Sequence, residues 1–93
     1  MKYSGTIKRI GARQDVSEKF SKREFVVTDP QEQYPQIIQF EVQNNMCDIM
    51  DAFVVGSMVD IEFTLRGREW TDPKGKVCVF NTLVAWKVTN KVI

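Results

Sequence analysis

Residues 58–68 read Met-Val-Asp-Ile-Glu-Phe-Thr-Leu-Arg-Gly-Arg, and this stretch decides the fold class. Its apolar side chains recur at every second position, at Val59, Ile61, Phe63 and Leu65. Successive side chains of a β-strand point to opposite faces, so this alternation predicts a strand with one face in a core. Arg66 and Arg68 extend the polar face of the same strand.

Four more strands are expected around this segment. They are predicted at residues 2–12, 22–28, 36–42 and 77–88, with a turn at residues 71–76 before the last one. The first strand changes phase across Lys8 and Arg9, which predicts a β-bulge. Residues 13–21 are mostly polar and charged, so we expect a loop there.

One helix is expected between residues 42 and 59. Asn44 or Asn45 can cap its N-terminus, and Gly56 is suited to end the segment. The stripe expected to face the core consists of Met46, Ile49, Met50 and Phe53, which follow helical spacing. The order of elements predicts a mainly β fold, a five-stranded OB-fold barrel with one α-helix between strands 3 and 4. The length of the chain predicts a single domain over residues 1–93.

The composition argues against catalysis. The chain has 93 residues, no histidine and a net charge of +1. The commonest general base is therefore missing, and no nucleophile stands beside a base. We expect no enzyme activity, no cofactor and no small-molecule substrate.

The cysteines and the apolar runs bear on metal sites and location. Cys47 and Cys78 are far apart and form no CxxC motif, which argues against a metal site. Two free buried thiols are favoured over a disulfide. No apolar run is long enough for a membrane span, and residues 1–5 lack a signal-peptide core. We expect a cytoplasmic protein.

The segment from Gly56 to Lys76 resembles the fourth strand and following hairpin of bacterial single-stranded DNA-binding proteins. The shared skeleton is G-S-x-V-x-I-x-x-x-L-R-x-R-x-W-T-D-x-x-G, with a distinctive tip at Arg-x-Arg-x-Trp-Thr-Asp. Residues 34–40 resemble the third strand of that family more weakly. The whole chain is also similar to small OB-fold proteins of unassigned function from Bacteroides-type bacteria and their phages. That likeness is carried by Gln33-Tyr34-Pro35 and Arg66-Gly67-Arg68-Glu69-Trp70.

The resemblance implies binding of single-stranded DNA without sequence preference, in replication, recombination or repair, by a homodimer or homotetramer. By position, the base-stacking aromatics of the DNA-binding family match Tyr34, Phe40 and Trp70, and its backbone-contacting arginines match Arg66 and Arg68. Two departures stand out. Gln39 replaces an apolar core residue of the family, and the local alternation places Phe40 in the core and not on a binding surface.

The residues themselves support part of this site. Period-2 geometry puts Arg66, Arg68 and Trp70 on one solvent-facing side, provided that Gly67 does not bulge. Cations beside a flat aromatic ring suit single-stranded nucleic acid. The cations neutralise the phosphates, and the ring stacks on the unpaired bases.

Alternatives remain for each candidate. Trp70 can instead cap the end of the barrel, with the arginines paired to Glu62 or Glu69. Lys74 and Lys76, on the turn, are further nucleic-acid-binding candidates, or are simply solvated.

The sequence does not decide the roles of several other aromatic residues and cations. Phe20 lies among cations, which suits nucleic acid or loop anchoring, and Phe80 can face either way. Trp86 is expected in the core or a subunit interface. Binding and solvation are equally compatible with the cluster Lys8, Arg9 and Arg13.

Two other functions remain open. The near-neutral charge favours a protein-interaction module, and stacking with phosphate contacts also suits RNA.

Overall fold

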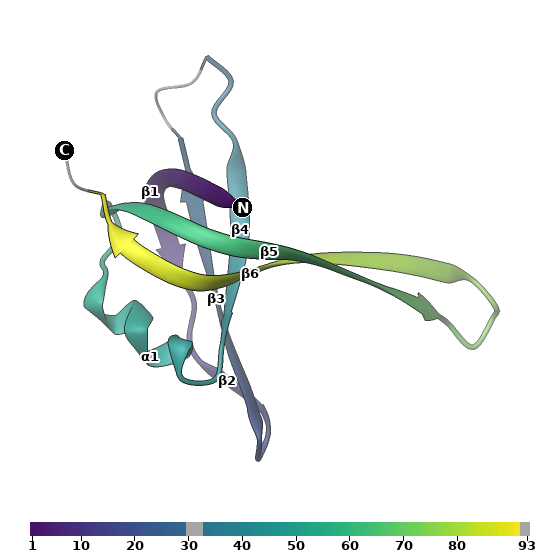
Figure 1. The fold of residues 1–93 in the computed structure, drawn as a ribbon. Helices are drawn as coiled ribbons and strands as arrows, with labels where there is room; N and C mark the ends of the chain where they lie inside the picture. Colours follow the sequence, from purple (N-terminus) through teal and green to yellow (C-terminus); the bar gives the residue numbers. More distant parts are fainter. Residues whose placement is uncertain (30–32, 92–93) are drawn as a thin grey trace.

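The computed structural model describes residues 1–29 and 33–91, and within them the chain forms six strands and one short helical segment (Figure 1). The elements are β1 (Lys2–Ile10), β2 (Gln14–Ser17), β3 (Phe20–Thr28), β4 (Ile37–Gln43), α1 (Met46–Ile49), the 3-10 turn η1 (Met50–Ala52), β5 (Met58–Thr71) and β6 (Val77–Asn90). The strands form one sheet in the order β1-β5-β6-β4-β3-β2, and β1 also pairs with β3. The mainly β class is therefore confirmed.

The predicted strand count is wrong because residues 14–17, expected in a loop, form β2. This strand pairs antiparallel with β3 across a two-residue turn. All four of its residues are exposed, so no apolar alternation marks it in the sequence. The extra strand also moves the helix, which follows the fourth strand and not the third.

The core is built from the alternating faces of the strands and from the helical segment. It consists of Ile7, Phe25, Val27, Phe40, Val42, Cys47, Met50, Phe53, Val59, Ile61, Phe63, Ala85 and Val88. Each large apolar side chain buried in this way contributes roughly 1.5–3 kcal/mol to folding. The predicted bulge in β1 is confirmed, because its register with β3 shifts between Ile7 and Arg9.

The helix is shorter than predicted, and its buried face differs. After one α-helical turn the chain tightens into η1, where side chains three residues apart lie above one another. Cys47, Met50 and Phe53 follow this spacing of three and are buried. Ile49, expected on the buried stripe, is 42% exposed. Asn45 occupies the N-cap position, but its side chain makes no capping hydrogen bond.

The outer halves of β5 and β6 form a two-stranded arm that projects from the rest of the molecule (Figure 1). β1 pairs with β5 only over residues 58–62, and β4 meets β6 at a single pair, Glu41 with Val84. The radius of gyration is 14.7 Å, whereas a compact chain of this length has about 12 Å. Leu65, predicted to face the core, is 54% exposed because none of the other strands in residues 1–29 and 33–91 covers this face of the arm.

The turn at the end of the arm is fixed by Asp72 and Gly75. A carboxylate oxygen of Asp72 accepts hydrogen bonds from the backbone amides of Lys74 and Lys76. The backbone carbonyl of Asp72 accepts one from the amide of Gly75 at 2.9 Å. Gly75 has φ 85, a left-handed conformation that glycine adopts without steric cost. The turn predicted at residues 71–76 therefore has a clear local cause.

Candidate nucleic-acid interface

A groove of about 730 Å³ lies between the β2–β3 hairpin and the arm. Its lining residues are Val16, Phe20, Lys22, Glu41, Gln43, Arg66, Gly67, Arg68, Phe80, Thr82 and Val84. They come from β2, β3, β4, β5 and β6, so the groove is assembled by the tertiary structure. Cationic and aromatic side chains from both walls meet in it.

The arm places Arg66 and Arg68 on one side because its pairing is regular. Arg66 pairs with Thr82, Gly67 with Asn81 and Arg68 with Phe80, without a register shift. Gly67 therefore does not bulge, and the period-2 geometry holds along this part of β5. Residues directly opposite each other in an antiparallel pair share a face, which puts Phe80 beside Arg68.

The guanidinium of Arg68 lies 6.0 Å from the ring centroid of Phe80, at the outer limit of a cation–π contact. Among the described residues, neither Arg66 nor Arg68 forms an ion pair. Glu62, considered as their partner, lies 3.7 Å from the ammonium group of Lys87. Glu69 pairs with Val79 and belongs to the other face of the arm. Both guanidinium groups are thus exposed cations beside the groove.

Trp70 and the turn lysines lie farther out on the arm. Trp70 continues the face of Arg66 and Arg68, pairs with Cys78 and is 48% exposed. It is not among the residues that line the groove. Lys74 and Lys76 are exposed, and within residues 1–29 and 33–91 their ammonium groups have no ion-pair partner.

The other two candidates from the resemblance lie elsewhere. Tyr34 is 75% exposed in the β3–β4 connection and does not line the groove. Phe40 is fully buried, with its ring centroid 5.6 Å from that of Phe25 and 5.1 Å from that of Phe63. The strand alternation placed Phe40 correctly in the core, so it offers no surface for a stacked base.

Two aromatic residues whose roles the sequence did not decide line the groove. Phe80 is 49% exposed on the arm, and Phe20 is half-buried on the β2–β3 hairpin. The lysines around Phe20 were the available signal, and one of them, Lys22, shares the groove. Lys22 lies 3.9 Å from Glu24, so its charge is partly offset.

The structure also gives the positions of Trp86 and of the two cysteines. Trp86 is 54% exposed and therefore not in the core. Both cysteines are free, Cys47 in the core and Cys78 half-buried on the arm. In the described part of the chain, no group of three or more metal-ligating side chains comes together. No helix there is long and apolar enough to cross a membrane.

Comparison with known proteins identifies a family and a fold. The model of the family described as Domain of unknown function (DUF3127) matches residues 2–89. No curated protein matches the chain. The family match covers almost the whole chain, and its description states no activity.

The fold is similar to that of solved single-stranded DNA-binding proteins. The mitochondrial protein of S. cerevisiae superposes with a TM-score of 0.74 at 14% identity, over 97% of this chain and 91% of that one. The small protein of Streptomyces coelicolor gives 0.66 at 12% identity, over 99% and 93%. A deletion variant of the Thermus aquaticus protein gives 0.76 at 13% identity, over 98% of this chain and 49% of that one. These structures share an OB-type fold with the chain.

Proposed function

The chain belongs to the family described as a domain of unknown function (DUF3127), and we propose that it binds single-stranded DNA without sequence preference. The observation that carries this proposal is the groove that Arg66, Arg68 and Phe80 of the arm line together with the hairpin residue Phe20. The similar folds of known single-stranded DNA-binding proteins support it.

The groove offers both interactions that an unpaired strand needs. The two guanidinium groups neutralise phosphates, and the rings of Phe20 and Phe80 accept the faces of unstacked bases, at about 1–3 kcal/mol per stack. Every nucleotide has a phosphate and a ring face, so this recognition does not depend on sequence. Trp70 continues the face of the arginines, and Lys74 and Lys76 lie on the exposed turn at the end of the arm.

A low net charge is compatible with this function because the cations are concentrated. Residues 66–76 contain four cations and two carboxylates. The Asp72 carboxylate is occupied by backbone amides, and Glu69 belongs to the opposite face. The lining of the groove itself has three cations, Lys22, Arg66 and Arg68, and one carboxylate, Glu41, so its field is more positive than the net charge of +1 suggests.

The strand pairings support the finer description of the fold as a closed OB-type barrel. They connect β1 to β5, β6, β4 and β3 in turn, and β3 back to β1. β2 is then an additional strand on the hairpin that borders the groove. The proposed biological role is protection of single strands during replication, recombination or repair.

Self-association into a homodimer or homotetramer is part of the proposal. The face of the arm opposite the arginines carries Leu65, Val77 and Val79, each more than half exposed. A two-stranded ribbon by itself is only marginally stable in water, so covering this apolar face would stabilise the arm. The same face and the net charge of +1 support a second candidate function, a protein-interaction module.

One titration separates these functions. A fluorescently labelled oligo-dT is titrated with the protein at low salt and then at increasing salt, with duplex DNA and oligo-U as controls. We expect binding of oligo-dT that weakens steeply with salt through counterion release, and much weaker binding of the duplex. No binding at low salt would exclude DNA and leave the protein-interaction module. Preference for oligo-U would assign the groove to RNA.

A further inference from the structure

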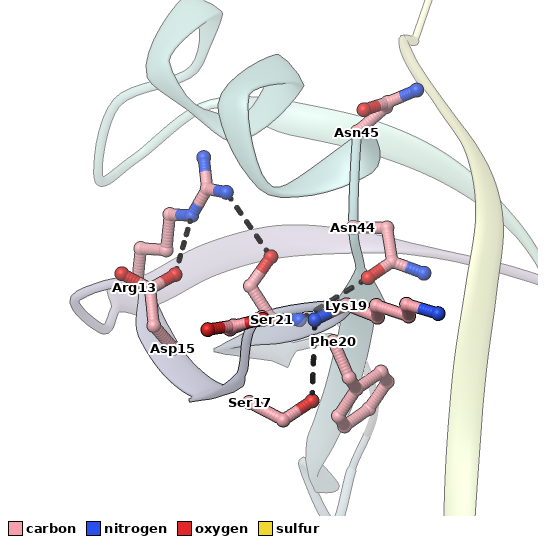
Figure 2. Close-up of a pocket in the computed structure, with 9 residues that line it drawn as sticks. Arg13, Asp15, Ser17, Lys19, Phe20, Ser21, Asn44 and Asn45 are labelled. Atoms are coloured by element: carbon pink, nitrogen blue, oxygen red, sulfur yellow. Dashed lines mark hydrogen bonds and ion pairs between the residues drawn. The ribbon is translucent and has the colours of Figure 1, made fainter.

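A second pocket of about 640 Å³ lies between the β2–β3 hairpin and the beginning of α1 (Figure 2). Arg13 and Asn44 border it, and so does Phe20, which also lines the candidate groove. The ring of Phe20 is therefore shared between the two hollows. Contacts that fix the hairpin at this pocket therefore also fix the position of Phe20 in the groove.

The outer end of the β2–β3 hairpin, formed by β2 and the turn, has little apolar packing to hold it, although the later part of β3 lies in the core. β2 pairs only with β3, and every residue of β2 is exposed. Beyond the pairing of β3 with β1 and β4, the contacts that connect this end of the hairpin to its surroundings are polar. The backbone amide of Ser21 donates to the side-chain oxygen of Asn44 at 3.1 Å (Figure 2). In return, the backbone amide of Asn44 donates to the backbone carbonyl of Ser21 at 2.8 Å. Asn44 adopts φ 53, a left-handed conformation that asparagine tolerates.

Arg13 ties the hairpin to α1 by three contacts from one guanidinium. Its Nε donates to a carboxylate oxygen of Asp15 at 3.2 Å, and its Nη2 donates to the hydroxyl of Ser21 at 3.1 Å (Figure 2). Its Nη1 donates to a carboxylate oxygen of Asp48, in α1, at 3.0 Å. The first two contacts hold the base of the hairpin, and the third attaches it to the helix.

We propose that Arg13 is a positioning residue that sets the place of the β2–β3 hairpin, and with it Phe20 and Val16, over the groove. This inference rests on the proposed function, because the hairpin is one wall of the proposed binding site. Arg13 acts through the hairpin and does not itself touch DNA.

The chemistry of Arg13 distinguishes it from a phosphate contact. Its donors are directed at Asp15, Asp48 and Ser21, and it does not line the groove. The hydrogen bond to Asp15 and the charge of Asp48 raise the pKa of Arg13 above its ordinary value, so the group stays charged. Both ion pairs are largely exposed, and such pairs contribute little to global stability. Their loss should therefore change local geometry more than the stability of the fold.

Asp48 provides a test in which positioning and simple electrostatics predict opposite signs. Asp48→Ala removes a negative charge, so it would strengthen DNA binding if Arg13 were a phosphate contact or if only net charge mattered. Positioning predicts that Asp48→Ala and Arg13→Ala each weaken oligo-dT binding by about three- to tenfold. The double variant should be no weaker than Arg13→Ala alone, because both changes break the same link. Asp48→Asn, which loses the charge but keeps an accepting oxygen, should restore most of the affinity.

Amide hydrogen exchange without DNA gives the second measurement. Arg13→Ala should accelerate exchange at residues 14–20 and leave the core amides of Phe25 and Val27 unchanged. Tighter binding by Asp48→Ala, equal affinities of Asp48→Ala and Asp48→Asn, or faster hairpin exchange at unchanged affinity would each overturn the proposal. If the wild-type chain binds no oligo-dT, the proposed function fails, whereas the exchange data still decide whether Arg13 anchors the hairpin.

Discussion

Two pairs of arginines in this molecule have opposite environments. Arg13 and Arg23, near the helical segment, are bound to carboxylates, Arg13 to Asp48 and Arg23 to Asp51. Arg66 and Arg68, on the arm, are exposed and form no ion pair within residues 1–29 and 33–91. An arginine held in an ion pair serves the fold, whereas the arm arginines, which form none, keep their charge available to a ligand.

The two pairs also differ in what their loss should cost. Arg23 has a side chain that is 16% exposed, and it donates to the carbonyls of Gly11 and Cys47 as well as to Asp51. It links β3 to the β1–β2 connection, to α1 and to η1. The arm arginines hold no other element in this way, so their charge is free to act on a partner. Measuring both stability and DNA affinity of variants therefore separates a structural from a binding role.

The largest effect is expected from the double variant Arg66→Ala with Arg68→Ala. Losing two charge-assisted contacts should weaken oligo-dT binding by about 2–3 kcal/mol, or roughly 30- to 150-fold. The slope of log affinity against log salt should become shallower by about 1.4, at about 0.7 per single-strand phosphate. Fluorescence anisotropy at several salt concentrations measures both. Lys87→Met, which removes a cation already beside Glu62, is the control. A slope as steep as that of the wild type would remove these arginines from the interface.

Arg23→Ala should show the reverse pattern. Two carbonyls lose a charged donor and Asp51 loses its partner, so the free energy of unfolding should fall by about 1.5–3 kcal/mol. Affinity for oligo-dT should stay within about twofold of the wild type, since Arg23 does not line the groove and, unlike Arg13, makes its hydrogen bonds outside β2 and Ser21. Urea unfolding and the same anisotropy titration provide the two numbers. Unchanged stability with a large loss of affinity would show that Arg23 acts in binding, as the arm arginines are proposed to do, and would contradict this prediction.

The smallest of the three effects is expected at Trp70, which shares the face of the arm arginines but lies beyond the groove. Trp70→Ala should lose one stacking contact at the lower end of its range, about 1 kcal/mol or roughly fivefold in affinity. The thermal midpoint should hardly change, because the indole is 48% exposed. Tyr34→Ala, measured alongside, tests the other exposed candidate from the resemblance. If Tyr34→Ala proves the more damaging variant, the binding path must include the β3–β4 connection.

Strand patterns were predictable wherever one face is buried. The alternation at Val59, Ile61 and Phe63 indicated their burial, and the same reasoning placed Phe40 in the core against the resemblance. The pattern failed at Leu65, because alternation does not reveal where the covering strands end. It was silent at β2, since a strand exposed on both faces has no apolar period.

The candidate site was predictable only on the arm. Arg66, Arg68 and Trp70 share a face through local period-2 geometry, and regular pairing through Gly67 keeps them there. The opposite wall was not predictable in this way. Phe20 enters the groove because β2 and α1 position its hairpin, through contacts such as Arg13 with Asp48, which are 35 residues apart.

The amino-acid sequence by itself determined the mainly β class, the core faces of the strands and the arginine face of the arm. These follow from backbone geometry that repeats every two residues. Only the tertiary structure decided that the arm projects uncovered, that the helical segment buries Cys47 and not Ile49, and which arginines are neutralised. Those outcomes depend on which distant segments come within a few ångströms of each other, and no local period carries that information.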